Sequence, residues 1–394
     1  MKYHQIVTSI LDQDLYKFTM MNAVIKRFSN AIVKYEFILR GDTEFPEGFG
    51  AELREQVQSL SDVTLTEWEY EKFQEKCGSY LDPTFFTFLR GFRFKPGQIG
   101  IIQKDGALHI SIEGLWFDTI LWEVILMAII SELYFLMTNQ PAEEEFLREK
   151  KLSKKAQFFN MNGMNFADFG TRRRHSLANQ REVVEYFKEH CRNTFVGTSN
   201  VLLALENDLT PIGTHAHEWF MFMGAKYGYK MANEKGLEHW SEVYKGHLGI
   251  ALSDTFTTEI FFRSFDVYYA KLFDGVRHDS GDPIDFGNRV IEHYKSLGID
   301  PTAKTIVFSD GLNLEICEKI IKAFRGKIRM SFGIGTFFTN DVGVKALNMV
   351  IKMLKAKPSN MGWEDTIKLS DNPIKHTGKE SEIIIAKSTL HLMN

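Results

Sequence analysis

The chain has 394 residues, of which 44% are hydrophobic and 25% charged, and its formal net charge is -4. These values are typical of a globular protein, and at roughly 100–200 residues per domain they predict about two domains. The acidic balance argues against a nucleic-acid-binding protein, which is usually basic, but it does not exclude local basic sites for small anions.

The first third of the chain mixes helical and strand patterns. Apolar residues recur at helical spacing over 11–28, and "VKYEFILRG" (33–41) alternates like a strand that ends in a turn. Helices are also expected over 51–60 and 67–78, and a strand over 107–114. We therefore expect an N-terminal α+β domain over residues 1–150, completed by the tail 361–394.

The most apolar stretch is "LWFDTILWEVILMAIISELYF" (115–135). Its longest charge-free run, Val124 to Ser131, is far shorter than the roughly 20 residues that span a bilayer, so we expect a buried or interface helix. Asp12 and Asp14 stand where a secretion signal needs an apolar core, and the three cysteines contain no CxxC pair. These features favour a protein of a reducing compartment, expected to be cytoplasmic and without a membrane partner.

From about residue 160 short apolar runs alternate with longer helical stretches, which are expected over 176–190, 215–234, 256–272, 285–296 and 312–325. This alternation predicts a parallel sheet, either open or closed into a barrel. The number of runs is close to eight, which favours an α/β class with an irregular (β/α) barrel-like domain over residues 151–360. Polar residues follow the runs, where barrel enzymes place their chemistry.

The stretch "SFGIGT" (331–336) places Gly333, Gly335 and Thr336 after an apolar strand. Glycines let backbone N–H groups approach an anion, so this turn resembles a phosphate cradle. The alternative is a tight turn that needs positive φ. A P-loop is excluded because GxxxxGK[ST] does not occur.

The stretch "GVRHDSGDP" (275–283) is denser in charge, with Arg277, Asp279 and Asp282. The arginine offers a planar fork for a carboxylate or phosphate, and the acids could hold ribose hydroxyls or Mg²⁺. The alternative for Asp282 is a helix cap.

Three further stretches end in polar residues. In "ADFGTRRRHS" (167–176) three arginines follow Phe169, and the cluster is either a polyanion site or a solvated loop. "ALSDT" and "VFSDG" each end in Ser-Asp, so that Asp254 could orient a histidine and Asp310 could meet a sugar or a metal.

The stretch "PIGTHAHEW" (211–219) carries two histidines two residues apart. In a strand His215 and His217 would share one face and could form a metal pair, although zinc needs three or four convergent ligands. The other functional interpretation is a neutral imidazole that carries a phosphoryl group. Two histidines satisfied by hydrogen bonds are the non-functional alternative.

Taken together in this order, the motifs resemble those of nicotinate phosphoribosyltransferases, and the match runs from "DQDLYKFTM" to "SFGIGT". The resemblance implies an α+β domain beside an irregular α/β barrel, in a homodimer with shared active sites. It implies an enzyme of the ligase class in NAD biosynthesis that joins nicotinate to phosphoribosyl pyrophosphate, giving nicotinate mononucleotide and pyrophosphate. ATP hydrolysis would be coupled through a phosphohistidine, with Mg²⁺ as the cofactor.

The resemblance also assigns residues. His217 matches the phosphorylated histidine, Asp279 the acid near ribose and Mg²⁺, and Arg277 and Arg172 the arginines near nicotinate and the diphosphate. The remaining substrate contacts that it implies are Tyr16, Phe169, Thr198, Ser199, Asp310, Gly311, Gly333, Gly335 and Thr336. Phe169 would stack on the pyridine ring, with Tyr16 supplied by the second subunit, and the three residues of "SFGIGT" would bind the 5′-phosphate.

Two positions concern specificity and orientation. Ser199 stands where a nicotinamide-using relative has an aspartate, which would repel a carboxylate, so Ser199 favours the acid. Glu218 follows the histidine instead of preceding it, so Asp254 is the better candidate for orienting His217. The alternatives are a barrel metallohydrolase using His215 and His217, a nicotinamide-specific transferase, and a non-catalytic nucleotide-binding protein.

Overall fold

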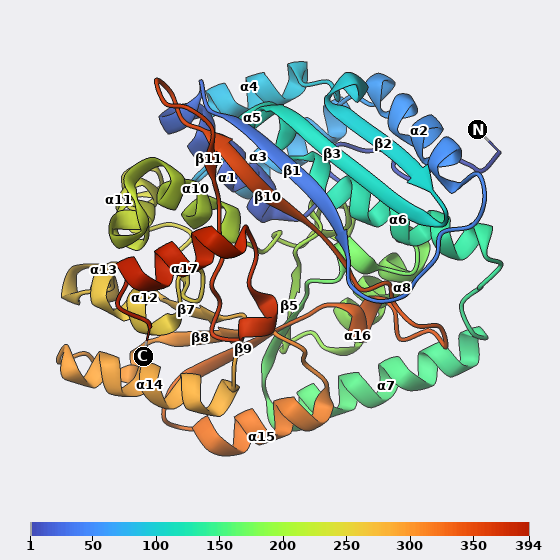
Figure 1. Cartoon of the computed structure of the whole chain (residues 1–394). Coiled ribbons are helices and arrows are strands. Elements are labelled where there is room, and N and C mark those ends of the chain that lie inside the picture. Colours follow the sequence, from blue (N-terminus) through green and yellow to red (C-terminus); the bar gives the residue numbers. More distant parts are fainter. Residues whose placement is uncertain (1, 394) are drawn as a thin grey trace. The chain divides into compact units, whose positions relative to one another are not determined.

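The structure is a computed structural model that describes residues 2–393 (Figure 1). The first part of the chain contains α1 (Leu15–Phe28), β1 (Ile32–Leu39), α2 (Phe49–Ser59), α3 (Glu67–Cys77), α4 (Pro83–Gly91), β2 (Ile99–Lys104), β3 (Ala107–Leu115), α5 (Trp116–Thr119), α6 (Trp122–Met137) and α7 (Glu145–Asn162). The middle contains β4 (Asn165–Asp168), the 3-10 turn η3 (Thr171–Arg173), α8 (Leu177–His190), β5 (Phe195–Thr198), α9 (Val201–Glu206), α10 (His217–Tyr227), α11 (Ala232–Tyr244), β6 (Ile250–Leu252), α12 (Thr258–Ser264), α13 (Val267–Leu272) and β7 (Gly275–His278). The last part contains α14 (Pro283–Ser296), β8 (Thr305–Phe308), α15 (Leu314–Phe324), β9 (Arg329–Ile334), α16 (Thr336–Thr339), β10 (Met349–Lys357), β11 (Glu364–Asp365) and α17 (Glu380–Thr389).

The chain folds as two compact units, each gathered from separate segments of sequence. Unit 1 contains the segment that ends at Asn22, Tyr35–Gly213 and Ile334–Lys352. Unit 2 contains Ala23–Lys34, Thr214–Gly333 and the chain from Met353 onward. The domain division expected from the sequence, at residues 150 and 360, stays a prediction.

Unit 2 is built on parallel strands in the order β9, β8, β7, β6. The pairing places Gly275 opposite both Ile250 and Thr305, and Thr305 opposite Arg329, so the strands start together and their C-terminal ends meet at one edge. This finding confirms the α/β class with a parallel sheet. Residues that directly follow β6, β7 and β8 are therefore brought together although they are distant in sequence.

Helices α14 and α15 pack side by side in unit 2 (Figure 1). Gly287 of α14 leaves no room for a side chain, because a Cβ there would lie 2.2 Å from the ring of Phe324 on α15. Asp282 caps α14 by accepting hydrogen bonds from the backbone N–H groups of Ile284 and Asp285, as the capping interpretation expects. The cap fixes the point at which the chain turns from the C-terminal end of β7 into α14.

Unit 1 contains both kinds of strand pairing. Strands β4 and β5 are parallel, with Asp168 opposite Thr198, whereas β2 and β3 form an antiparallel pair. The apolar segment Trp116–Met137 is long and apolar enough to cross a membrane, but 83% of its apolar window is buried inside the protein. It forms α5 and α6, and α6 is buried from Trp122 to Leu133, as expected for a core helix.

Candidate active site

The histidine pair does not lie on a strand. Residues from Thr210 to Ala216 are irregular, Ala216 is the extended N-cap residue, and His217 is the first residue of α10. Because the chain turns into a helix between the two histidines, they do not stand two apart on one strand, and the arrangement that would make them a metal-binding pair is absent at this stretch.

His215 is held inside the core. Its Nε2 accepts a hydrogen bond from the backbone N–H of Leu252 at 3.1 Å, and its ring makes edge contacts with Phe220 and Trp240. Burial lowers the pKa of His215 well below its usual value. A neutral, fully buried imidazole that packs on aromatic rings is a structural residue rather than a ligand.

His217 is surrounded by polar groups from three other segments of unit 2. Its Nδ1 lies 3.1 Å from the hydroxyl of Thr255, and its Nε2 lies 2.8 Å from Oδ2 of Asp279. Asp254 lies farther away, with Oδ1 at 3.6 Å from Nε2, which is longer than a hydrogen bond. The close partners of the ring are therefore Thr255 and Asp279, while an orienting role for Asp254 stays a prediction.

The neighbours of His217 come from the ends of adjacent strands. Asp254 and Thr255 follow β6, Asp279 follows β7, and Ser309 follows β8 and donates to Oδ1 of Asp279 at 3.0 Å. Parallel pairing of these strands explains why the residues meet, as expected for chemistry at C-terminal strand ends. Sequence reasoning selected both acids and missed Thr255 and Ser309.

The C-terminal segment also reaches His217. Lys368 Nζ lies 2.8 Å from Nε2 of His217 and 3.3 Å from Oδ2 of Asp254. The segment is fixed by the backbone N–H of Leu369, which donates to the carbonyl of Thr255 at 2.8 Å, and by a short antiparallel bridge between Lys368 and Thr377. Sequence reasoning missed Lys368 because "DTIKLSD" contains a single lysine among residues typical of a strand.

The C-terminal segment also contacts Asp254. In the structure Ser370 donates to Oδ2 of Asp254 at 3.1 Å, and Ser280 donates to the same oxygen at 2.6 Å. The C-terminal segment and the loop after β7 thus meet around one carboxylate.

Charge and burial set the protonation of this cluster. Burial, and next the positive charge of Lys368, lower the pKa of His217 to about 4, so its imidazole is neutral at pH 7. Burial alone would raise the pKa of Asp254, but Lys368 and His217 hold it at about 2. Burial is likewise outweighed at Asp279, whose pKa is held well below its usual range by Arg277 and His217. The site therefore combines a neutral imidazole with two carboxylates and one lysine.

Arg277 lies on β7 next to this cluster. Its Nε is buried and has no hydrogen-bond partner among the described residues, although its charge acts on Asp279. A buried, unpaired donor of this kind is uncommon in native proteins. It is the arrangement expected of an arginine that completes its hydrogen bonds with a ligand.

Two more predicted residues of unit 2, Asp310 and Gly311, follow β8. Lys375 bonds to Asp310 at 2.5 Å and to the backbone carbonyl of Asp279 at 3.0 Å, which links the ends of β7 and β8. Gly311 adopts φ +57°, a conformation that favours glycine. Gly333 lies inside β9.

In unit 1 the predicted substrate residues Thr198 and Ser199 are hydrogen-bonded to carboxylates. Thr198 donates its hydroxyl to Asp168 at 2.7 Å, and Ser199 donates to Asp14 at 2.7 Å. Burial raises the pKa of Asp168 to about 6, and it also raises the pKa of Asp14, where the charge of Arg172 opposes it. Asp14 is a member of "DQDLYKFTM", so this motif supports the segment that carries Ser199.

Phe169 and the end of "SFGIGT" are neighbours in unit 1. The N–H of Phe169 donates to the carbonyl of Ile334 at 2.8 Å, and Thr336 starts the short helix α16. Gly335 has φ -92°, and a Cβ there would meet nothing closer than the carbonyl oxygen of Phe169 at 3.5 Å. Its ψ of -114° lies outside the regions that residues with a Cβ adopt, so the backbone conformation explains the glycine.

The three arginines of "GTRRRHS" have different environments. Arg174 is fully buried and pairs with Asp12 through two hydrogen bonds of 2.6 and 2.7 Å, so it stabilises the fold. Arg172 is 42% exposed and lies 3.6 Å from Glu123. Burial, and next Arg172, lower the pKa of Arg173. The basic run is therefore one buried ion pair, one partly buried arginine and one accessible cation rather than a solvated loop. Tyr16, at the start of α1, is buried.

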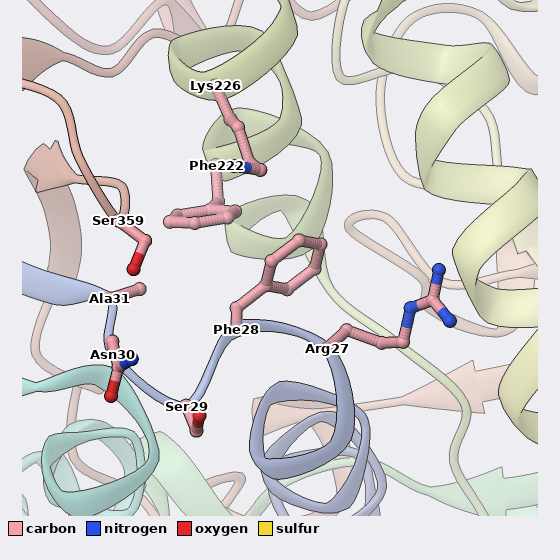
Figure 2. A pocket seen from close by; sticks show the side chains of 8 residues that line it. All are labelled: Arg27, Phe28, Ser29, Asn30, Ala31, Phe222, Lys226 and Ser359. Carbon is pink, nitrogen blue, oxygen red and sulfur yellow. The ribbon is translucent and has the colours of Figure 1, made fainter.

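A separate hollow of about 110 Å³ occurs in unit 2, lined by Arg27, Phe28, Phe222, Lys226 and neighbouring residues (Figure 2). Figure 2 shows the guanidinium of Arg27 turned away from the rings of Phe28 and Phe222. It bonds instead to Glu242 at 2.5 Å. The hollow contains none of the residues that the sequence selected, and its arginine is already paired.

Comparison with protein families decides the relationship. The model of the nicotinate phosphoribosyltransferase family matches residues 164–391, and the model of its N-terminal domain matches residues 11–131. The chain belongs to the nicotinate phosphoribosyltransferase family. A relative of that name from Chromohalobacter salexigens is 51% identical over 98% of this chain and 99% of its own, and one from Methanosarcina acetivorans is 42% identical over 97% of each.

Two solved structures of relatives with this name have the same fold. The enzyme from Porphyromonas gingivalis superimposes with a TM-score of 0.95 at 41% identity, covering 98% of this chain and all of that one. The enzyme from Vibrio cholerae has a TM-score of 0.92 at 34% identity, over 99% and 95% of the two chains. The resemblance deduced from the motifs is therefore confirmed at the level of family and fold.

Proposed function

We propose that the protein joins nicotinate and phosphoribosyl pyrophosphate into nicotinate mononucleotide and pyrophosphate, in NAD biosynthesis. Family membership over nearly the whole chain supports the reaction. The finer proposal is that ATP hydrolysis is coupled to this reaction through His217. The observation that carries it is a buried, neutral imidazole held at Nδ1 by Thr255, with its Nε2 beside Lys368.

A neutral imidazole is a competent nucleophile toward phosphorus. A histidine of ordinary pKa would be partly protonated near pH 6.5 and would lose its lone pair, whereas burial and Lys368 keep His217 unprotonated. The phosphoryl group on His217 would add negative charge among Lys368, Arg277 and the diphosphate of the bound substrate. That charge would favour the closed, competent arrangement of the site.

For the transfer itself we propose that positioning and charge neutralisation do most of the work. Positive charge develops on the ribose as pyrophosphate leaves, and the ring nitrogen of nicotinate is the nucleophile. Phe169 stacks on the pyridine ring, with Tyr16 supplied by the second subunit of a homodimer. Arg172 and Arg277 meet the carboxylate and the diphosphate, and Gly333, Gly335 and Thr336 bind the 5′-phosphate. The remaining contacts are those of Thr198, Ser199, Asp310 and Gly311.

Magnesium is proposed to enter with the diphosphate, as part of the substrate. The ligand atoms of His217, Asp254 and Asp279 lie within 4.8 Å of one another, which resembles a metal site. However, the ammonium group of Lys368 lies within 4.0 Å of a ligand atom of each of these residues. A cation already in the centre does not suit a resident divalent ion, so these residues meet Mg²⁺ through the substrate at Asp279.

The same lysine disfavours a barrel metallohydrolase, which would also need His215 as a ligand. A nicotinamide-specific transferase is disfavoured by Ser199, which lacks the negative charge that would reject the acid. A cytoplasmic location stays a prediction.

One assay tests the proposed function. Purified protein is given phosphoribosyl pyrophosphate and Mg²⁺ with either nicotinate or nicotinamide, each with and without ATP, and the mononucleotide is separated and quantified. Product from nicotinate, stimulated by ATP, is expected. Product from nicotinamide but not from nicotinate would show that the proposal is wrong. Binding of the substrates without formation of any mononucleotide would show the same.

The histidine is tested in the same assay. His217→Ala is expected to lose stimulation by ATP, because the phosphoryl acceptor is gone. Full stimulation by ATP in this variant would contradict the phosphohistidine. The dimer is tested separately by mixing a Tyr16→Ala protein with a Phe169→Ala protein, since shared sites predict partial recovery of activity in the mixed dimers.

A further inference from the structure

Lys368 is the cation at the centre of the His217 site. Its ammonium group lies 2.8 Å from Nε2 of His217, 3.3 Å from Oδ2 of Asp254 and 4.0 Å from Oδ2 of Asp279. Its side chain is only 5% exposed. Holding a buried lysine at this place costs desolvation free energy, which the surrounding acids offset.

One nitrogen of His217 has two competing partners. Asp279 Oδ2 and Lys368 Nζ both lie 2.8 Å from Nε2, but a neutral imidazole nitrogen is either a donor or an acceptor. If Nε2 carries the proton, it donates to Asp279. If the proton is on Nδ1, it donates to the hydroxyl of Thr255, and the lone pair of Nε2 accepts from Lys368.

The second arrangement is the reactive one. It places the free lone pair of the ring on Nε2 and directs it at a positive group. The other nearby lysine, Lys375, is bonded to Asp310 and to the carbonyl of Asp279, so it is committed elsewhere. Among the lysines of unit 2 with described contacts, Lys368 is the one in hydrogen-bond range of the ring.

We propose that Lys368 is a catalytic residue for phosphoryl transfer: its ammonium group selects Nε2 of His217 as the phosphoryl-accepting atom and then binds the transferred group. This role rests on the ATP-coupled function proposed above. The C-terminal segment 366–371 is thereby part of the phosphoryl-transfer site and not only of the scaffold.

The step balances with the atoms at hand. The Nε2 lone pair attacks the γ-phosphorus of ATP, the N–P bond forms as the bond to the bridging oxygen breaks, and that electron pair leaves on ADP. The ring keeps its proton on Nδ1, bonded to Thr255, and Asp254 stabilises the positive charge that the ring acquires. Lys368 moves from the nitrogen to the oxygens of the phosphoryl group, which rotation of its flexible four-carbon stem allows.

The position of the phosphate on the imidazole ring of His217 tests the proposal without any variant. The wild-type protein is incubated with ATP and Mg²⁺, quenched in alkali, digested, and compared by chromatography and ³¹P NMR with standards of the two phosphohistidine isomers. The Nε2 isomer is expected. Exclusive Nδ1-phosphohistidine would overturn the proposal, whatever the variants do.

Variants then test the ammonium group. Rapid-quench labelling with [γ-³²P]ATP is compared for wild type, Lys368→Met, Lys368→Arg and Lys379→Met. Lys379 lies on the same C-terminal segment but pairs with Asp365 at the surface, so it is the matched control. We expect labelling to fall at least about tenfold in Lys368→Met, to recover partly in Lys368→Arg, and to be unchanged in Lys379→Met.

The outcomes separate the two proposals. Labelling of Lys368→Met at the wild-type rate would refute the role of Lys368 and leave the phosphohistidine intact. Absence of label in the wild type, under conditions that give nicotinate mononucleotide, would refute the phosphohistidine and the role of Lys368 with it. Circular dichroism of each variant identifies a loss of folding. If a variant does not fold, the phosphohistidine isomer found in the wild-type protein decides whether the proposal holds.

Discussion

The ammonium group of Lys368 lies 2.8 Å from Nε2 of His217, although 151 residues separate the two in sequence. The contact depends on Thr255, whose hydroxyl meets the ring at Nδ1 and whose carbonyl accepts from the N–H of Leu369. One residue at the end of β6 therefore positions both the nucleophile and the segment that supplies its cation. Changes at Thr255 should consequently affect the histidine more than the rest of the site.

Replacement of Thr255 by valine keeps the shape of the side chain but removes the hydroxyl, which leaves Nδ1 of His217 without its partner. A hydrogen bond of this type is worth about 1 kcal/mol, so phosphoenzyme formation should slow by roughly 5- to 10-fold. Rapid-quench labelling measures the effect. Thr255→Ser, which keeps the hydroxyl, should stay within about twofold of wild type, and equal rates for the valine and serine variants would contradict the role given to this hydroxyl.

Titration of His217 gives a second prediction. Burial and Lys368 lower its pKa from 6.5 to about 4, so the ring should stay neutral throughout the range in which an ordinary histidine becomes charged. NMR of protein with labelled histidines, assigned with a His217→Asn variant, measures the midpoint. A midpoint near 6.5 would show that the ring is solvated and not held as described.

The same shift predicts how stability depends on pH. The folded-state pKa lies below the unfolded value, so protonation favours the unfolded state. The contribution of His217 is complete above pH 6.5 and is lost as pH falls from 6.5 towards 4. In urea unfolding over this window, His217→Asn should lose less stability than wild type, and parallel losses in the two proteins would argue against the shift.

Much of the fold could be predicted from the sequence because the spacing of apolar residues indicates which face of a helix or strand is buried. Helices such as α8, α14 and α15 lie within a few residues of the expected ranges, and "GVRH", "TIVF" and "RMSFGI" form β7, β8 and β9. The stretch before His217 is irregular, where a strand would have placed both histidines on one face. Its apolar residues are few. The backbone N–H of Ile212 donates to the carbonyl of Thr198 and not to a paired strand along this stretch.

The candidate site was predictable only in part, for a physical reason. Asp254 and Asp279 lie within two residues of a strand end, so the rule that C-terminal strand ends converge is enough to select them. Lys368 is brought in by a short bridge with Thr377 and one backbone bond to Thr255, and such tertiary contacts leave no periodic pattern. The hydrogen bond of Ser199 to Asp14 and the ion pair of Arg174 with Asp12 could not be predicted from the sequence for the same reason.

Ser199 is expected to determine the choice between acid and amide. In Ser199→Asp the new carboxylate would face Asp14, which bonds to Ser199 at 2.7 Å, and would also repel the carboxylate of nicotinate. An uncompensated charge contact of about 1–3 kcal/mol should raise the KM for nicotinate by about 5- to 150-fold, with a smaller effect on nicotinamide. Ser199→Asn, similar in size but uncharged, is the control, and an equal rise in KM for both variants would show that size and not charge matters.

Gly275 should be essential for the geometry of the catalytic edge. A Cβ at this position would lie 1.9 Å from the carbonyl oxygen and 3.1 Å from the Cα of Thr305, both on the neighbouring strand β8. Backbone atoms within a sheet cannot move aside as a flexible side chain can, so Gly275→Ala must push β7 and β8 apart. Overpacking of this kind typically costs about 1–3 kcal/mol, and the free energy of unfolding should fall by at least that amount.

Activity should fall in the same variant, because β7 leads into Asp279 and β8 into Ser309, which bond to each other at 3.0 Å. Separation of the strands weakens that bond and moves Asp279 relative to His217. Gly362→Ala is the control, since a Cβ there would have no atom within 4 Å. Denaturant unfolding and the nicotinate assay, carried out on both variants, should show loss of stability and turnover for position 275 alone. A Gly275→Ala protein with wild-type stability would mean that the sheet absorbs the methyl group, and the packing argument for this strand pair would be wrong.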